Sequence, residues 1–366
     1  MQLVSAKQSA VLSAYSGGCG ALQSLTIGTM RVPNQVVLAP MSGVSDLPFR
    51  RVADGFGAGL VVSEMVASRE LAAERRDVKR RAEGAGLDRY VIQIVGHEPY
   101  WMAEGARLAE GLGAHIIDIN MGCPAREVTG RQSGSALMRD IDHAQTLIEA
   151  VVGAVKVPVT LKMRLGWDNA TANAPELARR AAAAGVQMLT VHARTRCQFF
   201  KGHAEWARVK PVVDEVTIPV LVNGDILSLA DARHGLAQSG AAGVMIGRGA
   251  YGAPWLPGAI AHALGTGAAS VKTPALARQS AVAVAHVEAM LSHYGTHLGV
   301  RNARKHVGWY LASSGAPAQT VKDWRRRLCT EDIAAKVLSG LAEFYRSIVP
   351  SDALDRRQSD VREVVS

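Results

Sequence analysis

Hydrophobic residues in the middle of the chain fall into short, near-continuous runs that alternate with amphipathic segments rich in alanine and leucine. A short apolar run rich in β-branched side chains is typical of a strand buried on both faces, as in a parallel sheet. The eight predicted strands are Val36–Met41, Leu60–Met65, Tyr90–Gly96, His115–Gly122, Pro158–Gly166, Met188–Arg194, Pro219–Ile226 and Gly243–Ala250.

Eight strands, each followed by a helical segment, predict an α/β fold of the (β/α)8 type, the TIM barrel. An open doubly wound sheet is the alternative, but such a sheet rarely needs eight consecutive parallel units. In a barrel, functional side chains lie at the carboxyl ends of the strands. The fold prediction therefore also says where a site should lie.

Polar and ionisable residues end nearly all of the predicted strands. The clearest case is His115–Pro124, in which isoleucines form the strand and Asn120-Met-Gly-Cys123-Pro ends it with an amide and a thiol. A buried cysteine is usually inert, and each polar residue alone could be a hydrogen-bonded core residue. The repetition of the pattern at one rim favours a functional site. The other strand-end residues are Ser42, Glu64, Gln93, Lys162, Arg164, His192, Arg194, Asn223, Asp225 and Arg248.

The residue types at this rim indicate what it binds. Asn223-Gly224-Asp225 and Gly247-Arg248-Gly249 follow the last two strands, where barrels commonly hold a phosphate. Glycine lets backbone N–H groups approach an anion, and Arg248 adds a charged contact. Lys162 needs a negative partner in the barrel mouth. Two partners fit: a carbonyl substrate that forms a Schiff base, or a cofactor ring that becomes anionic on reduction.

Two side-chain amides narrow the choice of ligand. Gln93 and Asn120 offer paired donors and acceptors, which suit the edge of a heterocycle better than a sugar carbonyl. A phosphate site, a cation and two amides together favour flavin mononucleotide (FMN) over a sugar phosphate.

The chain changes character after about residue 270, where strand-like runs cease. Four helices are predicted there, over Gln279–Tyr294, Val300–Ser313, Thr320–Leu328 and Thr330–Ile348. Between Gly295 and Arg327, seven basic residues accompany one acidic residue, Asp323. The basic residues are Arg301, Arg304, Lys305, Lys322, Arg325, Arg326 and Arg327. Such a run is often only a solvated face, but the net charge of +9 also fits a polyanionic partner.

Composition sets the broad class of the protein. An apolar fraction of 48% with 20% charged residues fits a well-packed globular protein. No apolar run has the length of a membrane-spanning helix, and the first 22 residues lack the features of a signal peptide. The four cysteines share no Cys-x-x-Cys spacing, which argues against a disulfide framework or a structural zinc site and suits a reducing cytoplasm.

We therefore expect four segments: a flexible N-terminal extension (1–24), a catalytic barrel (25–268), a helical domain (269–350) and a frayed tail (351–366). A monomer in the cytoplasm, with no metal and no membrane partner, is expected.

Seven motifs resemble those of the tRNA-dihydrouridine synthase family in order and spacing, over roughly residues 25–350. They are Ala39–Arg50 (APMSGVSDLPFR), Asn120–Pro124 (NMGCP), Gly134–Leu137 (GSAL), Lys162–Arg164 (KMR), His192–Arg196 (HARTR), Asn223–Asp225 (NGD) and Gly247–Arg248. The NMGCP and GSAL motifs are most similar to the bacterial B-type branch.

The resemblance implies reduction of the C5=C6 bond of specific uridines in tRNA to 5,6-dihydrouridine, with FMN as cofactor and NADPH or NADH as reductant. It implies that Cys123 is the acid and that Asn120 and Arg164 lie near the substrate base. The implied FMN contacts are Pro40, Met41 and Ser42 along the ring, Gln93 and Lys162 at its pyrimidine edge, and His192, Asn223, Gly224, Asp225, Gly247 and Arg248 at the ribityl chain and phosphate. The expected tRNA contacts of the helical domain are Arg301, Arg304, Lys305, Arg325, Arg326 and Arg327.

Three positions depart from the family pattern. Arg126-Glu127 follows Cys-Pro where two basic residues are expected, Phe200 stands where an aromatic hydroxyl is common, and Ala193 stands where glycine is common. None of these changes removes a group that the chemistry needs.

The reaction itself explains the need for an acid. Because the C5=C6 bond is conjugated to the C4 carbonyl, hydride from flavin N5 adds at C6 and negative charge builds on C5 and O4. A proton must then reach C5 from the opposite face. A thiol with a pKa of about 8.5 is protonated at neutral pH and still gives up its proton readily. The base must also leave its stack, so a wide barrel mouth and a separate RNA-binding element are expected.

Two alternatives remain at this point. An FMN barrel acting on a free pyrimidine such as dihydroorotate shares most cofactor residues, but does not explain the basic helical domain. A non-catalytic RNA-binding protein has no use for a thiol beside a cofactor cation.

Overall fold

The computed structural model describes residues 24–130 and 132–348. These residues form two compact units, one that runs to Ala250 and includes Pro254–Val271, and one that combines Tyr251–Ala253 with the chain from Lys272 onward. The expected N-terminal extension, apart from residue 24, and the expected tail lie outside the described residues, as does Cys19.

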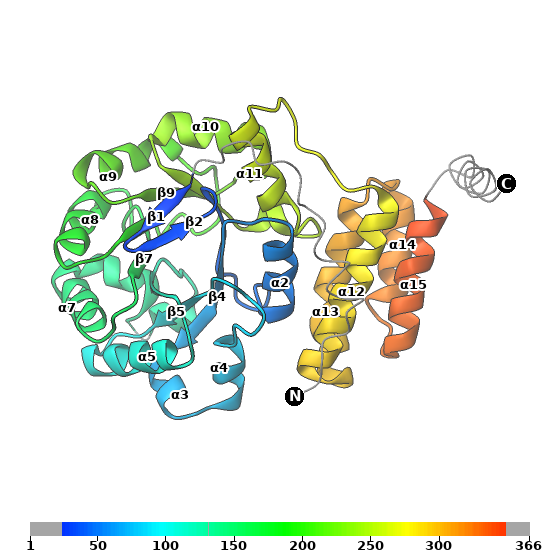
Figure 1. Cartoon of the computed structure of the whole chain (residues 1–366), viewed down its shortest axis with the longest axis horizontal. Helices are drawn as coiled ribbons and strands as arrows, with labels where there is room; N and C mark the ends of the chain where they lie inside the picture. Colours follow the sequence, from blue (N-terminus) through cyan, green and yellow to red (C-terminus); the bar gives the residue numbers. More distant parts are fainter. Residues whose placement is uncertain (1–23, 131, 349–366) are drawn as a thin grey trace. The chain divides into compact units, whose positions relative to one another are not determined.

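Eight parallel strands close into a barrel in the order β10-β3-β4-β5-β6-β7-β8-β9 (Figure 1). The strands are β3 (Val36–Leu38), β4 (Leu60–Ala67), β5 (Val91–Val95), β6 (Ile116–Met121), β7 (Val159–Arg164), β8 (Met188–His192), β9 (Val220–Asn223) and β10 (Gly243–Ile246). The predicted (β/α)8 barrel is confirmed. The predicted strand ends at Met41, Ile226 and Ala250 are wrong, because proline or glycine turns the chain earlier.

Helices and short 3-10 segments connect the strands. The helices are α2 (Leu47–Gly55), α3 (Ser68–Ala72), α4 (Arg76–Arg81), α5 (Pro99–Gly111), α6 (Arg126–Thr129), α7 (Ile141–Val152), α8 (Ala174–Ala183), α9 (Lys210–Glu215), α10 (Leu229–Ser239) and α11 (Leu256–Thr266). The 3-10 segments are Gly134–Arg139, Trp206–Val209 and Arg248–Ala250. Local sequence sets some helix ends: the Ser228 side chain caps α10 by accepting from Asp231 N–H, and Gly240 ends it in the left-handed conformation.

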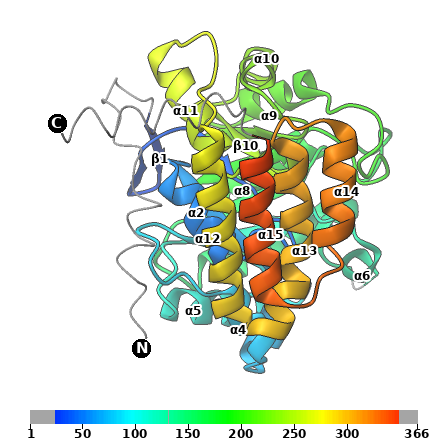
Figure 2. The ribbon, with the colours of Figure 1, turned by 90° about the vertical axis from the view of Figure 1, so that its right-hand side faces the viewer.

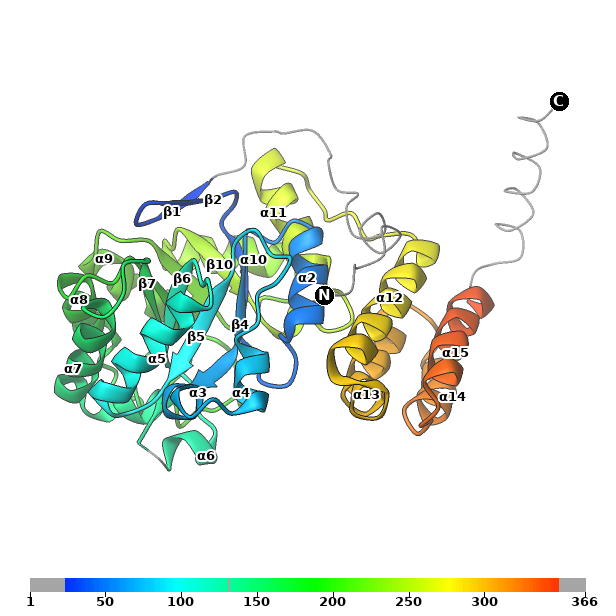
Figure 3. The same cartoon turned by 60° about the horizontal axis from the view of Figure 1, so that its bottom comes forward.

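A hairpin that was not predicted from the sequence closes the N-terminal end of the barrel. Strands β1 (Leu25–Ile27) and β2 (Met30–Val32) pair antiparallel (Figure 3). Their buried residues belong to one apolar cluster with residues near the starts of the barrel strands, such as Leu60, Val91 and Ile116. The two strands are only three residues each, too short for a clear alternating pattern.

On several strands, the inward-facing residues of the barrel change from apolar near the start of the strand to polar near its end. On β5, Val91 lies in the apolar cluster and Gln93 comes two residues later. On β6, Ile116 is followed by Asp118 and then Asn120. Because side chains alternate across a strand, residues two apart share the interior face. The apolar cluster therefore forms the floor of the barrel, and the polar groups gather towards its C-terminal mouth.

The second unit is a bundle of α12 (Leu276–Tyr294), α13 (Thr296–Ser313), α14 (Ala318–Leu328) and α15 (Ala334–Ser347) (Figure 2). The four predicted helices are present, but the last begins at Ala334 rather than Thr330. Its core includes Met290, Leu311 and Phe344. No helix within residues 24–348 is long and apolar enough to cross a membrane.

Candidate active site

Asn120 shapes the turn that carries Cys123. Its side-chain oxygen accepts hydrogen bonds from the backbone N–H groups of Gly122 (3.1 Å) and Cys123 (2.9 Å), directly after β6 ends. The Cys123 carbonyl accepts from the Ser135 hydroxyl (2.8 Å), which ties the turn to the Gly134–Arg139 segment. The thiol is thus held at the barrel mouth by its own backbone.

A chain of hydrogen bonds connects this turn to a buried carboxylate. Asn120 Nδ2 donates to Gln93 Oε1 (2.8 Å), and Gln93 Nε2 donates to Asp118 Oδ2 (2.7 Å). The other oxygen of Asp118 accepts from the Thr160 hydroxyl (2.6 Å). Burial raises the pKa of Asp118, while these hydrogen bonds and the charge of Lys162 lower it. Asp118 therefore fixes which way both amides point.

This network corrects the expectation that the two amides are open to a ligand. Gln93 and Asn120 bond to each other, so each amide retains only part of its hydrogen-bonding capacity for a heterocycle. Asp118 was not among the residues predicted from the sequence. Its signal was an acidic residue inside a run of isoleucines, which is rare in a buried strand unless its charge is paired.

The surroundings of Cys123 keep its thiol protonated. Burial raises the pKa of Cys123, although a backbone hydrogen bond from Ala125 and the charges of Arg164 and Lys162 act in the opposite direction. Of the described cysteines, Cys123, Cys197 and Cys329 are all free. Cys123 thus holds a proton at neutral pH, and two cations stand near enough to stabilise the thiolate once the proton leaves.

Lys162 lies inside the barrel, where its ammonium donates to Asn223 Oδ1 (3.1 Å). Asn223 Nδ2 donates in turn to the Met245 carbonyl (2.8 Å), so the amide orientation is fixed. Burial and the charge of Arg164 lower the pKa of Lys162 to about 8, against the favourable charge of Asp118. In this structure, the Asn223 side-chain oxygen is therefore the hydrogen-bond acceptor of Lys162.

Arg164 and Arg194, both buried, hold the loop that follows β8. Arg164 donates to the carbonyls of Gly122 (2.8 Å), Thr195 (2.8 Å) and Phe199 (2.9 Å). Arg194 donates to the carbonyls of Lys201 (3.1 Å) and Gly202 (2.8 Å). Arg164 was expected to contact substrate, but most of its donors join the Cys123 turn to this loop. The Lys162-Met-Arg164 motif in the sequence does not show that Arg164 would bind these backbone carbonyls.

Asp225 links two arginines at the expected phosphate end of the site. It pairs with Arg194 (2.5 Å) and Arg248 (2.8 Å) and has a left-handed backbone, φ 53°. Although burial opposes it, the hydrogen bond from Arg194 lowers the pKa of Asp225, so the carboxylate is charged. In this structure Asp225 therefore positions Arg248, the cation expected at the phosphate.

His192 has the clearest unmet hydrogen-bonding requirement in the site. It is buried at 8% exposure, and its Nδ1 has no partner among the described residues. Burial, and then the charges of Arg164 and Lys162, lower its pKa well below the usual value, so the ring is neutral. Gly224 lies against this ring with φ 114°, and a side chain there would meet both Ala204 and the imidazole.

The loop after β3 brings Pro40, Met41 and Ser42 to the same rim. Met41 N–H donates to the Ser45 hydroxyl (2.8 Å), and Gly43 N–H donates to the carboxylate of Glu64, which lies on β4. Gly247, directly after β10, faces Met41: a Cβ at this glycine would lie 3.6 Å from the Met41 sulfur. All predicted barrel residues of the site therefore belong to one mouth.

The structure gives several of the basic residues of the helical unit acidic partners. Arg304 pairs with Asp332 (2.5 Å), Arg327 with Glu343 (2.9 Å) and Arg326 with Asp323 (2.6 Å). Three of the expected tRNA contacts thus have an acidic partner in the bundle; Asp332 and Glu343 are distant in sequence from their arginines, whereas Asp323 lies three residues before Arg326. Arg301, Lys305, Lys322 and Arg325 have no ion pair within residues 24–348.

The donor set of the mouth fits FMN. The unpaired Nδ1 of His192 needs a hydrogen-bond partner, and the backbone lacks a side chain at Gly224, against the His192 ring, and at Gly247, near Met41. Arg248, half-exposed, supplies a cation for a phosphate, and Lys162 supplies one inside the mouth. Within the described residues, no group of three or more His, Cys, Asp or Glu side chains could hold a metal ion.

A closed (β/α)8 barrel with a fixed thiol, an interior lysine and clustered arginines at its C-terminal mouth defines a barrel enzyme. The sequence pattern of the dihydrouridine synthase family (Dus) matches residues 37–345. The chain belongs to this family, whose members are oxidoreductases.

Relatives and solved structures agree with this assignment. A probable tRNA-dihydrouridine synthase of Rickettsia conorii is 48% identical over 90% of this chain and 99% of its own length. One of Rhodobacter capsulatus is 54% identical over 80% and 91%. The tRNA-dihydrouridine synthase B of Pseudomonas syringae pv. tomato is 45% identical over 80% and 87%, which supports the B-type resemblance.

Two solved structures share the fold alone. A 2-naphthoyl-CoA reductase matches 68% of this chain and 52% of its own, with a TM-score of 0.52 and 12% identity. A histamine dehydrogenase from Rhizobium sp. 4-9 matches 90% of this chain and 64% of its own, with a TM-score of 0.53 and 12% identity. This chain therefore spans about half to two thirds of those proteins.

Proposed function

We propose that the protein reduces specific uridines of tRNA to 5,6-dihydrouridine, with FMN as cofactor and NADPH or NADH as the reductant. The observation that carries the proposal is the Cys123 turn, held by Asn120 at a barrel mouth that also contains Lys162. Membership of the dihydrouridine synthase family and relatives named tRNA-dihydrouridine synthase support it.

His192, Gly224, Gly247 and Arg248 would hold the ribityl chain and phosphate, with Lys162 at the pyrimidine edge of the ring. Bound FMN, once reduced, would supply the hydride that adds to C6 of uracil. Cys123 donates its proton to C5, and the nearby Arg164 and Lys162 stabilise the thiolate that remains. Asn120 and Arg164 keep the thiol in place through Gly122 and the Cys123 backbone.

The proposal is tested by following the absorbance of the enzyme-bound flavin. Reduction with NADPH and then addition of unmodified tRNA should restore the oxidised flavin spectrum under anaerobic conditions. Oxidation by a free pyrimidine but not by tRNA would favour the alternative barrel oxidoreductase. A purified protein that binds tRNA but never retains flavin would favour a non-catalytic role.

Asp118→Asn should slow uridine reduction about tenfold at unchanged flavin content. An amide offers one acceptor oxygen where the carboxylate offers two, and where its NH2 group faces Gln93 Nε2 the Gln93 bond is lost and the Asn120 turn shifts. Thr160→Val is the matched control, since it removes a single donor and leaves the Gln93 bond intact. The pH profile of Cys123 alkylation should shift in Asp118→Asn; an unchanged profile and rate would show that the network does not position the thiol.

The helical unit is the second element that we propose for tRNA binding. Exposed ion pairs are worth little, so Arg326 and Arg327 can exchange their carboxylate partners for phosphate. Arg325 on the same helix has no ion pair in the described part of the chain. These three arginines therefore remain candidates despite the pairing.

Changing Arg325, Arg326 and Arg327 together to Ala should weaken tRNA binding and flatten its salt dependence. The slope should fall by about one unit for each RNA phosphate that an arginine no longer neutralises. Binding would be measured at several salt concentrations. Glu343→Gln is the matched control, because it releases Arg327 and should preserve or tighten binding. Equal slopes for wild type and the triple variant would mean that these arginines form a solvated face.

A further inference from the structure

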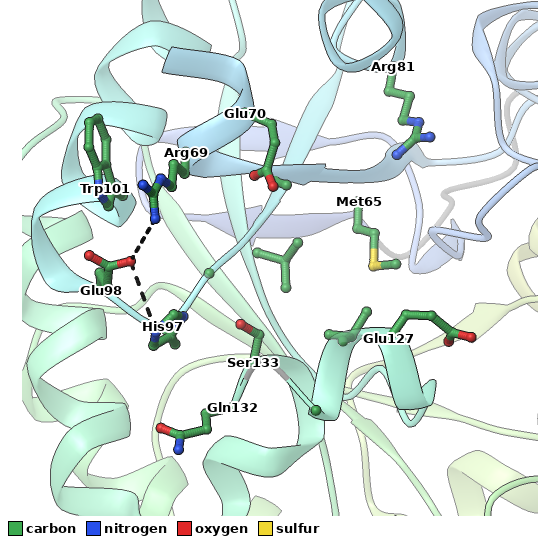
Figure 4. A pocket seen from close by; sticks show the side chains of 15 residues that line it. Met65, Arg69, Glu70, Arg81, His97, Glu98, Trp101, Glu127, Gln132 and Ser133 are labelled. Carbon is green, nitrogen blue, oxygen red and sulfur yellow. Dashed lines mark ion pairs between the residues drawn. The ribbon is translucent and has the colours of Figure 1, made fainter. Parts of the chain in front are cut away.

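A pocket of about 800 Å³ lies beside the Cys123 turn, and none of the residues proposed for catalysis or flavin binding lines it. Its walls come from the C-terminal ends of β4 and β5, the starts of α3 and α5, the end of α4, and the segment after Cys123 that includes α6 (Figure 4). These segments belong to one rim of the barrel. The pocket therefore opens on the same mouth as the thiol.

The loop that carries the thiol also forms one wall of this pocket. Glu127 and Val128, only a few residues after Cys123, line the pocket. A Cβ added to Gly134 would lie 2.8 Å from a Val128 methyl and 3.2 Å from Cys123 Cβ, so the pocket wall and the Cys123 side chain pack around one glycine. A strand of RNA that places a uridine at Cys123 would bring a neighbouring nucleotide to this pocket.

The lining of the pocket combines apolar side chains with charges of both signs. Met65, Val95 and Val128 provide the apolar surface. Arg81 and Glu127 lie with Met65 on one side (Figure 4), and neither has an ion pair in residues 24–130 or 132–348. Such a mixture does not suit a simple anion, because the carboxylate would repel it.

On the opposite side of the pocket, the charged and aromatic side chains already contact one another. Arg69 pairs with Glu98 (3.7 Å) and lies over the Trp101 ring, 5.8 Å from its centroid, and His97 approaches Glu98 at 4.0 Å (Figure 4). An aromatic ring with a guanidinium above it is a surface on which flat, polar rings stack. The unpaired charges of Arg81 and Glu127 are thus the groups that remain for a ligand.

We propose that this pocket binds the nucleotide that flanks the target uridine, and that it selects a base bearing an exocyclic amine. The inference rests on the proposed function, since it requires an RNA substrate. A carboxylate only accepts hydrogen bonds, so Glu127 favours guanine, adenine or cytosine, whose exocyclic amino groups donate, over uracil, whose one donor (N3–H) lies between two carbonyl oxygens that repel the carboxylate. Arg81 takes the phosphate, and the volume lies within the range of about 300–1,000 Å³ found for small-molecule sites.

The test uses the FMN-loaded full-length protein and two fluorescein-labelled RNA pentamers. One has its single uridine flanked by guanosines, and the other is all uridine. Glu127→Gln and Arg81→Ala should each weaken the guanosine-flanked RNA about tenfold by fluorescence anisotropy. Glu127→Gln should leave the all-uridine RNA unchanged, whereas Arg81→Ala should weaken both. The same variants should raise KM for unmodified tRNA with little change in kcat.

Matched controls are Glu149→Gln and Arg76→Ala, since Glu149 is on another helix and Arg76 lies on α4 with Arg81, and neither lines the pocket. The inference would be overturned if both pocket variants bound the guanosine-flanked RNA with wild-type affinity. It would also be overturned if Glu127→Gln lost the same amount of affinity for both RNAs. If wild type forms dihydrouridine and the pocket variants match it in KM, only this inference fails. If wild type forms none in any RNA, the proposed function fails, and the inference with it.

Discussion

Cys123→Ala is expected to slow the reduction of uridine by about 10²- to 10⁴-fold, the usual contribution of a general acid, while the flavin content stays unchanged. In the structure, the proton donor and the expected flavin contacts lie on different strands, so uridine reduction and flavin binding can be affected separately. The thiol follows β6, whereas the expected flavin contacts lie at the ends of other strands: His192 is the last residue of β8, and Gly224 and Arg248 follow β9 and β10. Loss of the proton donor should therefore affect the step that needs a proton at C5 and leave the reduction of the flavin by NADPH intact.

The measurement is the rate at which tRNA oxidises the reduced flavin in single-turnover experiments. Cys197→Ala is the matched control, because Cys197 is an exposed, free cysteine. The burial that raises the pKa of Cys123 adds a pH criterion: the wild-type rate should hold through neutral pH and fall only in alkaline solution, where the thiol loses its proton. A Cys123→Ala rate equal to that of wild type would assign the acid to another group.

Lys162→Ala is expected to weaken FMN binding by about 10- to 100-fold, as for the loss of one charge-assisted hydrogen bond. It should also slow flavin reduction, because the reduced ring carries negative charge that the ammonium offsets. Lys156→Ala is the matched control, since Lys156 is exposed just before β7. Full flavin content and a wild-type reduction rate in Lys162→Ala would place the lysine away from the ring.

The pKa of Lys162 predicts a pH dependence with a definite sign. Burial lowers this pKa to about 8, so the flavin-free protein loses the positive charge as the pH rises through that value. Wild-type FMN affinity should therefore fall above about pH 8, and Lys162→Ala should lack that fall. Titration of the flavin-free protein with FMN between pH 6.5 and 9.5 would show both, the range being about 1.5 units either side of the pKa.

The fold was predictable because the signal in each strand is local. Short apolar runs rich in β-branched residues, such as Ile116–Ile119, are typical of buried strands, and eight apolar runs in succession with helical segments between them leave few alternatives to the barrel. The β1–β2 hairpin was missed because three-residue strands show no periodicity, and its role in closing the barrel depends on distant residues such as Leu60.

The position of the candidate residues at one barrel mouth was largely predictable, but their contacts were not. Polar residues at strand ends indicated where Cys123 and Lys162 lie. Nothing local shows that Gln93 donates to Asp118 or that Arg164 donates to the carbonyl of Gly122, because these partners meet only when neighbouring strands align. For the same reason, the pairing of Arg327 with Glu343 required the packed bundle.

Whether this protein makes dihydrouridine in tRNA can be measured by nucleoside mass spectrometry. Purified FMN-loaded protein would be incubated with NADPH and unmodified tRNA transcripts, with Cys123→Ala as the paired sample. Wild type is expected to add two hydrogen atoms to the uracil ring at specific positions, and Cys123→Ala is expected to yield little product in the same time. Consumption of NADPH without dihydrouridine in tRNA, or equal product from both proteins, would contradict the proposed function.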